Sequence, residues 1–198
     1  MLNDTSSLLA HLRTRRSGKP RDMIGPGPSP EQLDAMLEIA ARTPDHGKLF
    51  PWRFVTVPYD ARAALGEKLA AILRREKADC TARDEEAAIQ FATQAPALVV
   101  VLSAPVVPHK IPVWEQELSA GAVCMNLLHA GHALGFAGAW ITGWAAYSEA
   151  VRDLFGDASQ KIAGFVFIGT PALPLEERPR PALSEIAHKW NRGYGPEA

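Results

Sequence analysis

Residues 114–143 read WEQELSAGAVCMNLLHAGHALGFAGAWITG, and this stretch decides how the rest of the chain is arranged. Its middle part, residues 118–130, is apolar except for three side chains, which are Ser119, Asn126 and His129. Apolar residues therefore cover nearly the whole circumference of the helix that this part predicts, and such a helix belongs in the middle of a fold. We expect a long central helix around which the other elements pack.

The length of this helix raises the alternative of a membrane span. A helix over residues 114–134 would be roughly 30 Å long at about 1.5 Å per residue. Polar and charged side chains within it argue against a span: Glu115, Glu117, Asn126, His129 and His132. Gly135 ends the helix, and residues 137–143 are expected to form a short buried strand.

Length and composition indicate one ordinary globular domain over residues 1–198. Hydrophobic residues make up 47% of the chain and charged residues 22%. The formal net charge of −1 predicts no bulk attraction to nucleic acid or to a membrane. Cys80 and Cys124 lie far apart, which favours free thiols in a reducing compartment. The first residues lack the pattern of a signal peptide, so we expect a cytoplasmic protein.

Periodicity and capping residues predict the remaining elements. Helices are expected at about residues 7–15, 30–40, 61–77, 84–93 and 148–155, and strands at 52–57, 97–104 and 162–169. The segment MIGPGPSP at residues 23–30 is expected to be a loop, and the proline-rich tail an extended arm. Helices that alternate with buried strands predict a sheet covered by helices on its faces.

Two groups of residues are candidates for ligand binding. Arg15, Arg16 and Ser17 at the end of the first helix suit a phosphate monoester, because guanidinium groups match phosphate oxygens bidentately. The alternative is a solvated basic turn. Arg42 and His46 stand four residues apart across a helix exit, where they either shape the turn or face one anionic or polar ligand.

Other catalytic patterns are missing from the sequence. His129 and His132 have a spacing that could hold a metal, but neither has a neighbouring carboxylate or cysteine ligand, so we interpret them as core histidines. The glycines of residues 135–140 do not form a dinucleotide fingerprint, and neither a Walker loop nor a GxSxG elbow is found. The residues alone thus indicate an α/β domain with a candidate anion site and no metal.

Five motifs taken together add a family resemblance. They are RRS at 15–17, RTPDH at 42–46, PWRFV at 51–55, the stretch at 114–143 and FIGTP at 167–171. In this order and spacing they resemble the FMN-dependent nitroreductase family across about residues 8–173. The run from His109 to Gly121 is most similar to the small, single-domain NAD(P)H nitroreductase-like subgroup of bacteria.

The resemblance implies an α+β fold, a three-layer α/β/α sandwich with a long central helix. It also implies an intertwined homodimer that exchanges terminal segments, so that the arm at residues 174–198 would reach the partner. FMN would lie in the interface between the subunits. No catalytic side chain and no metal ligand is implied.

The resemblance also implies which residues bind the cofactors. Those expected at FMN are Arg15, Arg16 and Ser17 at the phosphate and ribityl region, Arg42 and His46 from the next loop, and Trp140, Ile141 and Thr142 along the core strand. Of these groups, one is expected to come from the partner chain. Those expected at the nicotinamide nucleotide are Ala130, Gly131, His132, Ala133, Leu134 and Gly135.

The implied activity is transfer of hydride from NADH or NADPH, through FMN, to a small-molecule electron acceptor such as a nitroaromatic or a quinone. One shared site implies ping-pong kinetics. Two alternatives stay open at this point. In the first alternative, the chain is an FMN-binding protein with another role, such as dehalogenation, flavin storage or sensing. In the second, it is a structural dimer whose basic turn docks an acidic partner.

Overall fold

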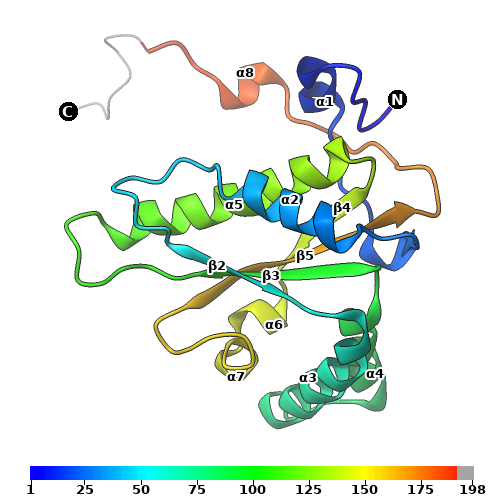
Figure 1. Ribbon diagram of the computed structural model, residues 1–198. Coiled ribbons are helices and arrows are strands. Elements are labelled where there is room, and N and C mark those ends of the chain that lie inside the picture. Colours follow the sequence, from blue (N-terminus) through cyan, green and yellow to red (C-terminus); the bar gives the residue numbers. More distant parts are fainter. Residues whose placement is uncertain (191–198) are drawn as a thin grey trace.

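A computed structural model describes residues 1–190, and its centre is a five-stranded antiparallel sheet (Figure 1). The strands are β1 (Met23–Ile24), β2 (Trp52–Thr56), β3 (Ala97–Ser103), β4 (Ala137–Ile141) and β5 (Lys161–Pro171). The longest strand, β5, pairs with β3, β4 and β1, while β2 pairs with β3. All seven residues of β3 are buried, as its continuous apolar sequence predicted.

Helices cover both faces of this sheet (Figure 1). One face carries α2 (Pro30–Ala40) and α5 (Val113–Ala133), and the other carries α3 (Arg62–Glu76), α4 (Ala82–Thr93), α6 (Trp144–Tyr147) and α7 (Glu149–Arg152). Alternate residues of β3 enter the two cores, with Val100 on the α3 and α4 side and Val99 on the α5 side. The predicted α+β, three-layer α/β/α sandwich is confirmed.

The long central helix is confirmed as α5, but one side of it is bare in a single chain. Val123 and Leu127 are fully buried in the core beside the sheet. Trp114 is 67% exposed and Leu118 is 54% exposed. The expectation that neighbours surround the helix on every side is therefore wrong for one chain, because the sheet and α2 cover only part of its circumference.

Other segments differ from the sequence prediction in detail. The predicted loop at 23–30 begins with β1, whose two residues pair with Thr170 and Pro171 of β5. The helix predicted at 148–155 is the shorter α7, which starts after Ser148, where the Ser148 hydroxyl accepts a hydrogen bond from Val151 N at 3.1 Å. The short helix α6, which precedes Ser148, was not predicted. The strand predicted at 137–143 ends at Ile141. Two 3₁₀ turns, η1 (Pro20–Asp22) and η2 (Tyr59–Ala61), complete the connections.

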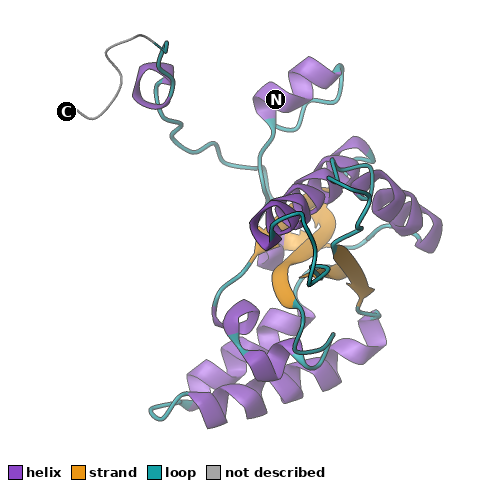
Figure 2. Ribbon diagram, turned by 90° about the vertical axis from the view of Figure 1, so that its left-hand side faces the viewer, coloured by secondary structure: helices purple, strands orange, loops and turns teal. Residues whose placement is uncertain are grey.

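The two ends of the described chain lie on the same side of the sandwich (Figure 1). The helix α1 (Leu8–Thr14) starts at Ser7, whose hydroxyl accepts from Ala10 N. The arm is mostly extended, as predicted, with one helical turn, α8 (Leu183–Ile186), that stands away from the body of the chain (Figure 2). The last part of the predicted arm, residues 191–198, lies outside the described residues.

Two further expectations concern a membrane-spanning helix and the state of the two cysteines. Over residues 1–190, none of the helices combines the length and the apolar character needed to cross a membrane. Cys80 and Cys124 are both free thiols, as their spacing predicted.

A buried arginine at the start of α3, Arg62, is bonded both to the main chain that follows β2 and to the main chain that leads into β3. The Arg62 guanidinium, in a residue that is 1% exposed, donates to four main-chain carbonyls, those of Val57, Gln94, Ala95 and Pro96. Burial lowers its pKa. These bonds satisfy the carbonyls of a tight turn before β3, in which Ala95 has a left-handed backbone with φ of 59°.

Replacing this cation is expected to destabilise the fold. Arg62→Met leaves the carbonyls buried without donors, so the free energy of unfolding should fall by about 3 kcal/mol in urea denaturation. Arg75→Met, an exposed arginine on the same helix, is the control and should change stability by no more than about 0.5 kcal/mol. Equal stability of the two variants would contradict the role given to Arg62.

Candidate functional site

The basic turn after α1 is held rigidly against the sheet. The Asn3 side chain donates from Nδ2 to the Arg16 carbonyl at 3.0 Å and accepts from Arg16 N at 2.7 Å. Gly18 N donates to the Gly138 carbonyl of β4 at 3.1 Å. These bonds fix Arg15, Arg16 and Ser17 beside the strand that carries Trp140.

The arm adds a further cation to this turn. Arg180 donates from Nη2 to the Arg15 carbonyl at 3.4 Å, and Arg16 Nε donates to the Glu176 carbonyl at 2.6 Å. Burial is the largest cause that lowers the pKa of Arg15, and the charges of Arg180 and Arg16 lower it further. Three neighbouring guanidinium groups, one of them partly desolvated, favour an anionic ligand such as a phosphate.

The end of β4 presents a flat aromatic side chain next to this turn. The Trp140 indole donates from Nε1 to the Ala163 carbonyl at 2.9 Å. It lies across Gly164, where an added Cβ would be 2.0 Å from Nε1, so only glycine allows this position. Ile141 and Thr142 follow, both half-buried. The strand therefore offers an apolar ledge that begins close to the basic turn.

The RTPDH loop is anchored along α5, from its first turn to Asn126. Ser119 Oγ donates to the Pro44 carbonyl at 2.7 Å, and Asn126 Nδ2 donates to Thr43 Oγ1 at 2.8 Å. The His46 ring nitrogen Nδ1 lies 2.8 Å from Glu115 Oε2. Arg42 and His46 themselves are exposed.

Of the predicted FMN residues, Arg15 and His46 lie near different ends of α5. The charge of Arg15 contributes to the lowered pKa of His129, which places the basic turn beside the last turns of α5. His46 contacts Glu115 in the first turn. Positions 115 and 129 are separated by roughly 21 Å at about 1.5 Å per residue. A ligand that touches both Arg15 and His46 within one chain would have to span this distance.

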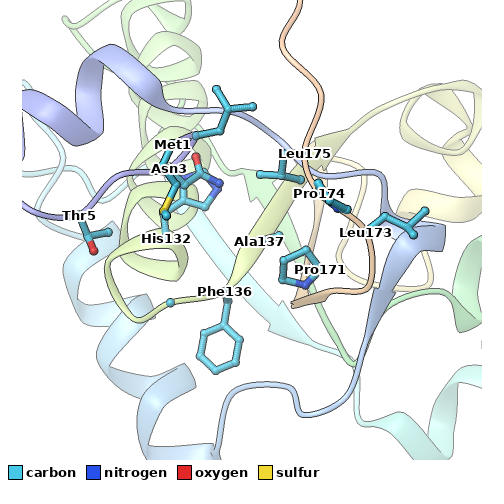
Figure 3. A pocket seen from close by; sticks show the side chains of 12 residues that line it. Met1, Asn3, Thr5, His132, Phe136, Ala137, Pro171, Leu173, Pro174 and Leu175 are labelled. Carbon is cyan, nitrogen blue, oxygen red and sulfur yellow. The ribbon is translucent and has the colours of Figure 1, made fainter.

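A separate cavity of about 380 Å³ lies at the end of α5, between the N-terminal residues and the arm (Figure 3). Of the residues predicted at the nicotinamide nucleotide, His132 and Gly135 line it. Ala130 and Gly131 are buried, whereas Ala133 and Leu134 are exposed. No charged side chain is among the residues that line this cavity.

Three histidines pack where α1 meets α5. The His11 and His129 rings approach with Nε2 and Nδ1 2.8 Å apart, and His132 is 1% exposed with neither ring nitrogen hydrogen-bonded. Among residues 1–190 no group of histidine, cysteine and acidic side chains could hold a metal ion. Burial, followed by the charges of His11 and Arg15, lowers the pKa of His132 to about 3, so this core histidine is neutral at pH 7.

Comparison with protein families matches residues 12–170 to the Nitroreductase family. The chain is 37% identical over 167 residues to the "Putative NAD(P)H nitroreductase YdjA" of Escherichia coli strain K12, and the match covers 82% of this chain and 87% of that protein. The chain belongs to the nitroreductase family.

Solved structures agree with this fold. A nitroreductase-like family protein from Bacillus cereus superposes with a TM-score of 0.81 at 20% identity, covering 93% of this chain and 96% of the other. A nitroreductase from Bacteroides fragilis, solved with bound FMN, gives a TM-score of 0.68 at 24% identity over 88% and 94% of the two chains.

Sequence reasoning did not single out several residues that shape this nitroreductase-family site. Arg180 lies in the proline-rich arm, and no local pattern shows that the arm returns to the basic turn. Glu115, Ser119 and Asn126 anchor the RTPDH loop. A signal for the latter two was visible, because a polar side chain on an otherwise apolar helix must find a buried partner.

Because His132 is buried, we expect the free energy of unfolding to fall as the pH is lowered. Its folded-state pKa lies below the value of about 6.5 in an unfolded chain, so the unfolded state binds more protons as the pH falls below about 6.5. Stability should therefore be lost on acidification from about pH 6.5 toward pH 3, by roughly 2 kcal/mol between pH 6.5 and pH 5.

Urea denaturation at a series of pH values measures this loss. In His132→Leu the dependence of the free energy of unfolding on pH should be shallower over that range, whatever the absolute stability of the variant. His188→Leu, an exposed histidine in the arm, serves as the control and should keep the wild-type slope. A wild-type slope in His132→Leu would show that His132 is not the group responsible.

Proposed function

We propose that the protein is an FMN-dependent oxidoreductase, which transfers hydride from NADH or NADPH to a small acceptor such as a nitroaromatic or a quinone. Family membership and the name of the 37% identical Escherichia coli relative support this class of activity. A single site used in turn by the nicotinamide and the acceptor gives ping-pong kinetics. When bound, FMN supplies the hydride-carrying chemistry, and the protein supplies position and electrostatics.

The observation that carries the proposal is the cluster of cations beside β4. Arg15, Arg16 and Arg180 would hold the FMN phosphate, with the Ser17 hydroxyl beside it. The partly buried Arg15 gains most from an anion, because desolvation and two like charges oppose its own charge. The ledge of Trp140, Ile141 and Thr142 would then run along the cofactor.

We propose that the protein works as a homodimer. A two-fold axis through the middle of α5 would bring the first turn of one helix beside the last turns of the other. His46 and Arg42 of one copy would then reach the cofactor held by Arg15 of the other. The same arrangement covers the exposed Trp114 and Leu118, and the exposed apolar residues of the arm, Leu183, Ile186 and Trp190, would pack on the partner.

The alternatives named above make different predictions about turnover. An FMN store or sensor would bind the cofactor without NAD(P)H oxidation faster than that of free FMN. A dehalogenase would need a halogenated acceptor, and a structural dimer would stay colourless. The cytoplasm is the compartment in which NAD(P)H is supplied, and we propose it as the location.

Flavin binding and turnover are the direct test. The purified wild-type protein should absorb as a flavoprotein and oxidise NAD(P)H when a nitroaromatic is added. The double variant Arg15→Ala/Arg16→Ala should bind FMN at least tenfold more weakly, since each hydrogen bond from a charged donor contributes about 1.5–3 kcal/mol. Fluorescence titration with FMN measures the affinity.

The double variant Arg13→Ala/Arg21→Ala removes the same charge from exposed positions on either side of the turn. It should bind FMN as the wild type does, apart from a small change that salt abolishes. Protein that stays colourless after addition of FMN would refute the proposed function. Unchanged affinity in Arg15→Ala/Arg16→Ala would refute the phosphate site alone.

The exposed side of α5 is the proposed dimer interface, so a charge placed there is expected to dissociate the dimer. Leu118→Glu places a charge in the proposed interface, where burial without a partner costs several kcal/mol. Light scattering should give twice the chain mass of 21.5 kDa for the wild type and the single mass for the variant, together with loss of FMN. Tyr147→Glu, at an exposed position on the opposite face, should stay dimeric. A wild type of single mass would rule out the shared site.

A further inference from the structure

We propose that His46 donates a proton to the acceptor during its reduction, and that Glu115 is the residue that positions the His46 ring for this step. The inference rests on the proposed function and assigns a role to two side chains of its site. It starts from the 2.8 Å contact between His46 Nδ1 and Glu115 Oε2.

This contact fixes which ring nitrogen faces outward. A carboxylate only accepts hydrogen bonds, so the hydrogen of the bond is on His46 Nδ1, which donates to Glu115. The second nitrogen, Nε2, is left for a ligand, and the His46 side chain is 69% exposed. An orienting carboxylate on one nitrogen and a free second nitrogen is the arrangement by which histidines act as general acids and bases.

The main chain on both sides of the ring is also held. Pro44 and Thr43 are bonded to Ser119 and Asn126 of α5, and Asp45 Oδ2 accepts from Phe50 N at 2.9 Å. Because these bonds already anchor the loop, the His46–Glu115 pair is not needed to attach it. The pair sets the direction of the ring instead, which is what a proton donor requires.

Other charged groups of this region are engaged elsewhere or lie in the loop itself. Glu117, two residues after Glu115, pairs with Lys161 Nζ at 2.8 Å and faces away from His46. Asp45 is used within the loop, which also carries Arg42 and Lys48. Glu115 is therefore the acidic group that the structure places on the His46 ring.

The chemistry of the proposed acceptors needs such a donor. Conversion of a quinone to a hydroquinone adds one hydride and one proton, and NAD(P)H is the source of the hydride. In its imidazolium form His46 carries hydrogens on both nitrogens, and the proton would leave Nε2 for a quinone oxygen, so that an N–H bond breaks and an O–H bond forms. The neutral ring that is left keeps its hydrogen on Nδ1, and a hydronium ion from the solvent reprotonates Nε2. Within the proposed dimer, His46 of one copy faces the site built on Arg15 of the other.

Two acceptors separate a proton donor from a residue that merely shapes the site. Ferricyanide takes one electron and no proton, whereas a quinone needs both. Both rates are expressed per bound FMN, because His46 is also expected at the cofactor. The ratio of the quinone rate to the ferricyanide rate should fall by about 100-fold in His46→Gln, the usual contribution of a general acid. Glu115→Ala should show a smaller loss with the same selectivity for the quinone.

The matched control is Glu117→Ala, which removes an acid from the same helix and should behave as the wild type with both acceptors. A second readout does not depend on turnover. Nitrogen NMR of the full-length protein should show a hydrogen-bonded Nδ1–H at His46 in the wild type and in Glu117→Ala, and its loss in Glu115→Ala.

Equal losses with quinone and ferricyanide would overturn the proposal, because they would show a role in binding or positioning the cofactor. Full quinone activity in His46→Gln, or an unchanged NMR signal in Glu115→Ala, would overturn it as well. Absence of FMN from the wild type would instead refute the proposed function, and the NMR comparison would still report whether Glu115 orients the ring.

Discussion

A 21-residue helix with apolar residues around its circumference needs neighbours on every side, and one copy of this chain supplies them on only part of it. The sheet and α2 cover two sides of α5, and the RTPDH loop is bonded to polar side chains along a third. What remains exposed is an apolar stripe that includes Leu118. The proposed second copy would cover the stripe, bring His46 to the basic turn of its partner, and give the projecting arm a surface on which to pack.

The other constraint is electrostatic. The basic turn gathers Arg15, Arg16 and Arg180 against β4, and burial makes Arg15 costly to keep charged without an anion. The Glu177 carboxylate on the arm pairs with Arg180 at 3.4 Å, and its charge partly offsets this cost at Arg15. The contact of Glu176 with Arg16 is through its main-chain carbonyl. A doubly charged phosphate on a flat, largely apolar molecule would satisfy the cations, while the Trp140 ledge would receive the ring.

The elements that sequence reasoning predicted well are those decided by local periodicity, such as α5, the fully buried β3 and the helices of the opposite layer. The two residues of β1 pair only through their main chain, so no side-chain pattern marks them. The buried Arg62 reads as a surface cation in sequence, because its carbonyl partners lie more than thirty residues away, apart from that of Val57. The basic turn and the pair Arg42 and His46 were candidates from the residue types alone, and the remaining site residues came from a family resemblance. Neither source says anything of their partners within this chain. That Glu115 meets His46, 69 residues earlier, is decided by how the loop packs on α5.

The separation of about 21 Å along α5 between positions 115 and 129 has a consequence for the concentration of complete sites that a given amount of chain can provide. If each site draws its parts from two molecules, the concentration of complete sites follows the square of the free chain concentration when the chain is scarce. Newly synthesised chains would then be inactive until they dimerise, and dilution alone would lower the activity without any change to the residues themselves.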